Sequence, residues 1–95
     1  MYLFLGQETV VSTRDIVGVF DLDKSTTSAE TKRFLTGAQK QGRIVDVSPG
    51  ELPTSFVVCE RDGETMVYLS QISAGTLKKR AVPFMPRGHL PFLSR

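Results

Sequence analysis

Residues 61–64, Arg-Asp-Gly-Glu, lie between two β-prone runs, TSFVVCE at 54–60 and TMVYLSQI at 65–72. Asp-Gly suits the two central positions of a tight hairpin turn, which require positive φ angles. The two runs are therefore predicted to pair as a β-hairpin. Further β-prone runs occur at 1–5, 8–12, 15–22 and 43–47. A chain built from so many short strands has to form a sheet and cover it.

The segment 24–41 is the main candidate for that cover, because its period is helical. Its apolar residues at helical spacing are Ala29, Phe34, Leu35 and Ala38. Thr27 followed by Glu30 fits a capping box, and Gly42 fits the residue just past a helix C-terminus. A shorter helix is predicted over 73–80, with Ser73 as its N-cap.

These elements predict a small α+β domain of about six short, mainly antiparallel strands, one principal helix and a short C-terminal helix. Simple alternation along the strand 15–22 places Val17 and Val19 on one face. It places the following residues on the other face: Ile16, Gly18, Phe20 and Leu22. Gly18 also indicates that another part of the protein packs closely there.

The chain has 95 residues, which corresponds to one domain, predicted over 1–80 and followed by a tail at 81–95. Prolines at 83, 86 and 91 exclude regular structure from the tail, which is interpreted as a docking arm or a segment that orders on assembly rather than an inert end. No signal peptide or membrane span is recognised, so a cytoplasmic location without membrane attachment is expected. The single cysteine, Cys59, is predicted to be a core thiol.

Charge is distributed unevenly along the chain. Residues 1–64 contain seven Lys or Arg and all ten acids, whereas residues 65–95 contain five Lys or Arg and no acid. A basic C-terminal part indicates an anionic partner, of which nucleic acid is the commonest. An acidic protein face, a membrane surface or merely a solvated basic end would give the same pattern.

Catalytic and cofactor motifs are not found. The only histidine, His89, lies in the tail, and one histidine cannot make a metal site by itself. Cys59 has no neighbouring base, and Asp21 with Asp23 lack further ligands. No glycine pattern typical of phosphate or dinucleotide loops occurs. The chain is therefore predicted not to be an enzyme and to need no metal or cofactor, which leaves binding as the better class.

The candidate binding residues are the cations Arg14, Arg43, Lys78, Lys79 and Arg80. Arg14 interrupts the apolar run VVSTRDIVGVFDLD, where the backbone between two strands is held in place. Its planar guanidinium suits phosphate, and copies of it in a symmetric oligomer would act together. The alternatives are a simple turn at Arg14 and Asp15, or an ion pair between subunits with an acid such as Glu8.

Five blocks carry a family resemblance: MYLFLG, VVSTRDIVGVFDLD, GRIVDVS, SFVV and VYLSQISAGTLKKR. Together they span roughly residues 1–80 and resemble the RemA/RemB family of bacterial extracellular matrix regulatory proteins, and its RemB branch most. The resemblance implies a LytTR-like fold and a cytoplasmic regulator of matrix and biofilm genes. It also implies a closed ring of identical subunits that binds double-stranded DNA through its phosphates.

Within that resemblance, Arg14 occupies the position of a DNA-contacting arginine. A basic pair in the loop before SFVV is replaced here by Glu51 and Leu52, which removes two cations and adds an anion. The first hypothesis is therefore a DNA-binding transcriptional regulator that acts as a ring-shaped homo-oligomer. The second is an assembly module that partners a RemA-like protein and does not bind DNA directly.

Overall fold

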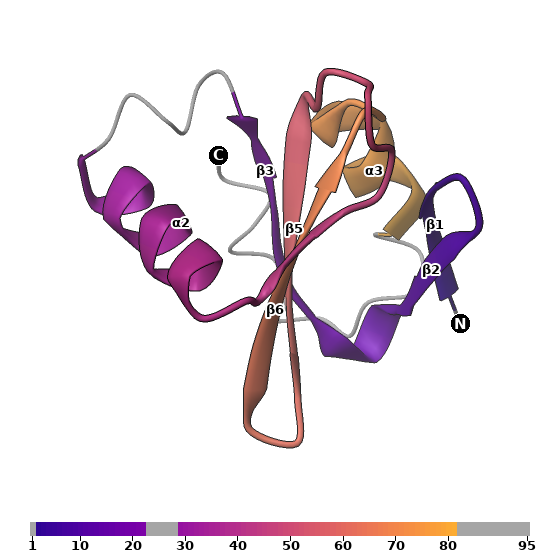
Figure 1. Cartoon of the computed structure of the whole chain (residues 1–95). Helices are drawn as coiled ribbons and strands as arrows, with labels where there is room; N and C mark the ends of the chain where they lie inside the picture. Colours follow the sequence, from indigo (N-terminus) through magenta and orange to yellow (C-terminus); the bar gives the residue numbers. More distant parts are fainter. Residues whose placement is uncertain (1, 23–28, 82–95) are drawn as a thin grey trace.

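The protein is represented by a computed structural model that describes residues 2–22 and 29–81 (Figure 1). The strands are β1 (Tyr2–Gly6), β2 (Thr9–Ser12), β3 (Ile16–Asp21), β4 (Ile44–Asp46), β5 (Ser55–Arg61) and β6 (Glu64–Ser70). The helices are the short 3-10 turn η1 (Thr13–Asp15), α2 (Ala29–Lys40) and α3 (Ala74–Ala81). The predicted α+β class is confirmed over the described part of the chain. Residues 82–95 of the tail and the predicted N-cap Thr27 lie outside the described residues, whereas residue 81 is the last of α3.

The strands form two sheets. β1 and β2 pair as an antiparallel hairpin, and the other four lie in the order β3-β5-β6-β4. The pairs of the larger sheet are antiparallel except that the short β4 runs parallel to β6. The predicted hairpin is confirmed: Asp62 and Gly63 have φ angles of 53° and 81°, and Arg61 pairs with Glu64. This hairpin forms the centre of the sheet.

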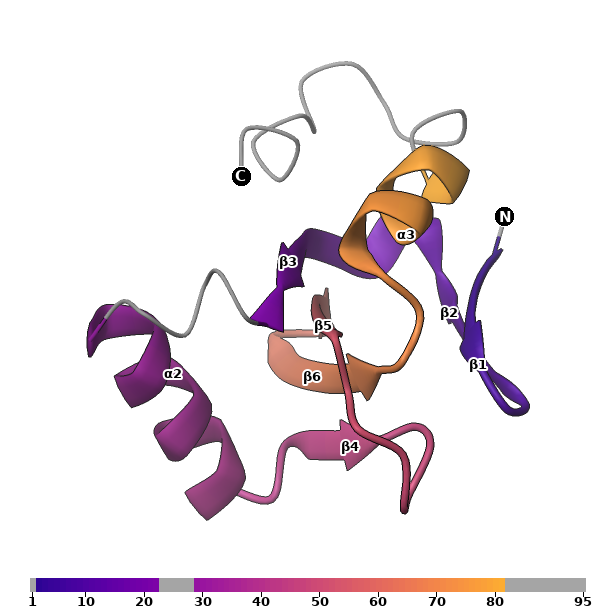
Figure 2. The same cartoon turned by 90° about the horizontal axis from the view of Figure 1, so that it is seen from above.

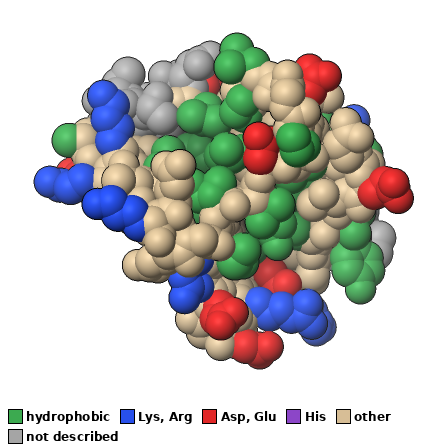
Figure 3. All heavy atoms as spheres, in the orientation of Figure 1, with side chains coloured by type: hydrophobic (Ala, Val, Ile, Leu, Met, Phe, Trp, Pro, Cys, Tyr) green, Lys and Arg blue, Asp and Glu red, His purple; other side chains and the backbone are tan. Residues whose placement is uncertain are grey.

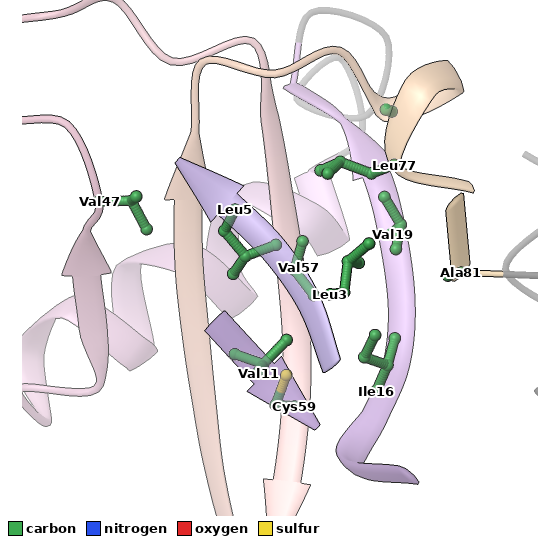
Figure 4. Close-up of a cluster of buried hydrophobic side chains, with 11 residues drawn as sticks. Leu3, Leu5, Val11, Ile16, Val19, Val47, Val57, Cys59, Leu77 and Ala81 are labelled. Atoms are coloured by element: carbon green, nitrogen blue, oxygen red, sulfur yellow. The ribbon is translucent and has the colours of Figure 1, made fainter. Parts of the chain in front are cut away.

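The larger sheet lies between two layers (Figure 2). Helix α2 covers one face, where the buried residues are Ala38, Phe56, Val58 and Val67. On this face the rings of Phe20 and Phe56 stack with their centroids 5.0 Å apart. The β1–β2 hairpin and α3 cover the opposite face and bury a second cluster around Leu5, Val57 and Leu77 (Figure 4). Each face of the sheet therefore buries its own apolar cluster.

One prediction about β3 is wrong. The pairing of β3 with β5 shifts between Ile16 and Gly18, so Val17 is the extra residue of a β-bulge. Ile16 and Val19 consequently share the cluster under α3, whereas Phe20 lies on the α2 face. Simple alternation had assigned Ile16 and Phe20 to one face. A bulge reverses the alternation because it inserts a residue that has no partner on the neighbouring strand.

The helix boundaries follow local chemistry. Helix α2 ends before Gly42, whose φ of 69° is the left-handed conformation expected just past a helix, and the amide of Arg43 donates to the carbonyl of Ala38 at 2.9 Å. Ser73 caps α3 as predicted, since its hydroxyl accepts from the Thr76 amide at 3.2 Å. The end of α2 and the start of α3 are therefore set by these local interactions, and with them the positions of the basic residues on the two helices.

Two buried serines, which no sequence pattern indicated, hold segments against the central hairpin: Ser70 holds β1, and Ser55 holds the residues before α3. Ser70 donates to the carbonyl of Leu5 at 2.6 Å and accepts from the Ile72 amide at 3.0 Å. Ser55 donates to the carbonyl of Ile72 at 2.7 Å. Buried polar groups need such partners. The serines therefore anchor β1 and the start of α3 to the end of the central hairpin.

Candidate nucleic-acid interface

Arg14 lies on a held turn. The one-turn helix η1 is capped by Ser12, whose hydroxyl accepts from the Arg14 amide at 3.3 Å. Thr13 beside it is buried, whereas Arg14 is exposed. The backbone is therefore fixed and the guanidinium projects outward, as the interruption of the apolar run predicted.

Arg14 lines a groove of about 640 Å³ between η1, β2 and the central hairpin. Arg61, at the end of β5, lines the same groove. Three carboxylates accompany these two arginines, from Asp15, Asp62 and Glu64. The charged side chains of the lining thus carry a net charge of −1. A phosphate that reaches Arg14 meets a locally acidic surrounding, and Arg14 alone is a weak anion site.

Cys59 lies at the bottom of this region, beside Val11 in the core (Figure 4). Burial, and secondarily the negative charge of Asp15, raises the pKa of its thiol to about 12 from an ordinary value of 9.0. The pKa of Tyr68 is raised as well, first by burial and then by the charges of Cys59 and Asp15. The thiol is a core side chain, as predicted, and it stays protonated at neutral pH.

The high pKa of Cys59 predicts a specific loss of stability at alkaline pH. The thiol loses its proton near pH 9 in the unfolded chain and only near pH 12 in the folded protein. The free energy of unfolding is therefore unaffected by this group below about pH 9, and it falls as the pH rises from 9 toward 12. Urea unfolding at several pH values checks this. Cys59→Ala should unfold with a smaller loss across the same range. Rapid labelling of the native thiol by a disulfide reagent at pH 8 would contradict it.

The C-terminal basic cluster is carried by α3. Its buried residues are Ala74, Leu77 and Ala81, which face the core. Lys79 and Arg80 are exposed, and Lys78 is half-buried. The basic residues occupy the last turn, where the helix dipole favours cations. Since α3 and η1 both belong to the layer opposite α2, these cations lie on the same side of the large sheet as Arg14.

The structure separates Arg43 from the other predicted residues. Arg43 lies between α2 and β4, on the α2 side of the sheet. Its Nε donates to Gln41 Oε1 at 3.0 Å and its NH1 donates to the carbonyl of Thr65 at 3.1 Å. Arg33 of α2 lines the same groove. The five predicted cations thus divide into two groups, one on each side of the sheet.

Two further cations, Arg61 and Arg33, line these grooves but were not singled out from the sequence as candidate sites. Arg61 had been assigned to the hairpin turn, although it follows Cys59 by two residues on a strand and so lies on the same face. Arg33 is exposed on α2, as are Lys32 and Lys40 of the same helix. Lys and Arg side chains do gather on the α2 side of the molecule (Figure 3).

The described residues contain no group of three or more His, Cys, Asp or Glu that could hold a metal ion. None of the helices in residues 2–22 and 29–81 is long and apolar enough to cross a membrane.

The sequence matches the RemA-like family, described as extracellular matrix regulatory protein A-like, over residues 3–81. The chain therefore belongs to this family of regulatory proteins. It is also 44% identical over 81 residues to Extracellular matrix regulatory protein B of Bacillus subtilis (strain 168). The aligned residues cover 85% of this chain and 90% of that protein. Both findings confirm the family predicted from the sequence, and the similarity to Extracellular matrix regulatory protein B agrees with its RemB branch.

Proposed function

We propose that this protein is a DNA-binding regulator of extracellular matrix and biofilm genes that acts in the cytoplasm as a ring-shaped homo-oligomer. The observation that carries the proposal is the exposed guanidinium of Arg14 on a capped, held turn. Arg61, Lys79 and Arg80 are exposed on the same side of the large sheet. Phosphate contacts of this kind give affinity without base readout.

The acidic neighbours of Arg14 require that several subunits act together. One subunit offers a groove with a net charge of −1 in its lining, so a single copy gains little from a phosphate. Copies held in one assembly bind one duplex with a high effective concentration. DNA binding is therefore expected only from the oligomer.

Two separate apolar patches supply a contact between subunits. On the outer face of the β1–β2 hairpin, Tyr2, Phe4 and Val10 are exposed, Tyr2 by 72%. A second, apolar groove of about 330 Å³ lies beside β3 and α2, with Val17 and Phe56 in its lining. Burial of exposed apolar side chains drives association. Contact between two different patches is head-to-tail, and it closes into a ring when the rotation permits.

The test is binding of a duplex of about 60 base pairs, measured by fluorescence anisotropy at about 50 and about 200 mM salt, with the mass of the protein followed by light scattering. The expected result is an oligomer whose affinity falls steeply with salt, with a slope near −0.9 per phosphate contacted. A negative charge introduced on the apolar hairpin face by Phe4→Glu should lower the mass of the oligomer and abolish DNA binding together. An affinity that does not change with salt would refute the phosphate contacts.

A second function is favoured by Leu52, which is 85% exposed in the loop between β4 and β5, next to the exposed Glu51. An exposed leucine beside an acid suits a protein partner better than a phosphate. In this alternative the chain assembles with a RemA-like protein and leaves DNA contact to it. Mixed oligomers that form with such a protein and are lost in Leu52→Asp would favour it. DNA-binding rings of this chain alone would exclude it.

A further inference from the structure

The groove between α2 and the central hairpin has the chemistry of an anion site. Its volume is about 450 Å³, which falls in the range of small-ligand sites. Among the described residues, the lining contains Arg33 and Arg43, with Gln41 and Thr65 as further polar side chains, and no Asp or Glu. Its charged groups thus carry +2, whereas those of the groove at Arg14 carry −1.

Arg43 is positioned in advance for a ligand. Two of its N–H groups are held by neutral acceptors, the side chain of Gln41 and the carbonyl of Thr65. These bonds orient the guanidinium without neutralising its charge, and they leave further donors on the fork. A positioned arginine loses little conformational freedom when an oxyanion binds.

Gly37 is the independent observation that points to a ligand. It lies in the interior of α2, where glycine is less favourable than alanine. A Cβ at Gly37 would meet no atom of the described residues within 4 Å, and no positive φ requires a glycine there. Neither the backbone conformation nor the packing of residues 2–22 and 29–81 requires a glycine at this position. It does line the groove, and a bare backbone lets a ligand approach closely.

We propose that this groove binds a nucleoside monophosphate or a closely related small phosphorylated ligand that carries a flat ring. Arg33 and Arg43 hold the phosphate as charge-assisted hydrogen-bond donors. The ligand lies over Gly37, and its base contacts the ring of Phe34, which lines the groove and is 42% exposed. The site lies on the opposite side of the sheet from Arg14, so it does not depend on the proposed DNA contacts.

The test is isothermal titration of the full chain with adenosine monophosphate, inorganic phosphate and adenosine. The monophosphate is expected to bind, phosphate more weakly, and adenosine not at all. Arg33→Gln should weaken the binding by about tenfold, because a bond between charged groups is lost. Arg43→Lys keeps the charge and loses the fork, and should weaken it too. No heat with the monophosphate, while the protein is folded, overturns the proposal.

Gly37→Ala is the most informative variant, because it should raise the stability of the helix and lower the affinity for the ligand. Alanine should raise the melting temperature by about 4 °C, since it favours the helix, and yet weaken binding of the monophosphate. A stabilised variant that binds as the natural protein does would overturn the proposal. Lys32→Ala, an exposed cation of the same helix outside the groove lining, is the matched control and should bind normally.

Two further measurements separate this site from the proposed function. The affinity for duplex DNA should be unchanged in Gly37→Ala. If the variant loses duplex affinity and the natural protein does not bind the monophosphate, the groove holds the DNA backbone and the small-ligand proposal is overturned. Phe34 also lines the apolar groove beside β3. The mass of the oligomer is therefore measured with and without nucleotide. If the titration gives heat only under conditions in which the mass changes, the heat comes from assembly and the proposal is overturned.

Discussion

Replacing Leu77 by alanine is expected to lower the free energy of unfolding by about 2–5 kcal/mol, the range for a large aliphatic side chain truncated in a packed core. Leu77 is fully buried, and it belongs to the cluster that joins α3 to the β1–β2 hairpin and the sheet. Domains of this size are stable by about 5–15 kcal/mol, so the loss is a large share of the total. Urea unfolding at a fixed protein concentration measures it.

The loss of Leu77 should also be visible locally. Helix α3 has eight residues, fewer than the roughly 12–15 that an isolated helix needs to be stable in water. Its helicity therefore depends on the packing of Leu77, Ala74 and Ala81. Hydrogen exchange of the amides of α3 should accelerate in Leu77→Ala more than exchange in β5. Leu52→Ala is the matched control, since this side chain is 85% exposed and its loss should leave stability unchanged. Equal stability of the two variants would contradict this packing.

The fold was largely predictable because its signals are local. The hairpin followed from the conformational needs of Asp62 and Gly63, the end of α2 from Gly42, and the start of α3 from Ser73. The bulge at Val17 had no such signal, since it depends on how β3 pairs with β5, forty residues away in the chain. The same is true of the parallel pairing of β4 with β6 and of the hydrogen bonds that Ser55 and Ser70 make when buried.

The site was less predictable than the fold. The sequence identified exposed cations, and Arg14, Lys79 and Arg80 are exposed. It could not show which cations share a surface, because that depends on the layers around the sheet. Arg43 was grouped with Arg14, yet the sheet lies between them. The carboxylates around Arg14 were also not predicted, since Asp62 and Glu64 reach its groove from the turn between β5 and β6 and from the start of β6.

The Arg14→Ala substitution is expected to cause the largest functional loss of any single change on this surface. In an assembly that contacts one duplex through several subunits, the substitution removes one phosphate contact from each subunit engaged. The dependence of log K on log salt should then become shallower by about 0.9 for every contact removed. The affinity loss at low salt multiplies across subunits, so it should exceed the effect that one surface cation has in a monomer.

Anisotropy with the same duplex at several salt concentrations measures the change, beside a mass measurement that confirms an intact oligomer. Lys32→Ala is the control, because it removes an exposed cation from the α2 side of the sheet and should leave the slope unchanged. Arg14→Lys should keep most of the salt slope but lose affinity, since the ammonium lacks the planar fork. Equal slopes for Arg14→Ala and the natural protein would exclude Arg14 from the DNA contact.

Removal of an acidic neighbour of Arg14 is expected to raise the affinity for DNA, the opposite of the effect of removing Arg14. Asp15 adjoins Arg14 and lines the same groove, so Asp15→Asn changes the net charge of the charged lining side chains from −1 to 0. If phosphate contacts at Arg14 carry the binding, this variant should bind DNA more tightly at low salt, and the gain should shrink as salt screens it. It should also lower the pKa of Cys59, because the charge of Asp15 is one of the causes that raise it. An Arg14 that faces phosphate predicts both a loss of affinity on its own removal and a gain on removal of its acidic neighbour.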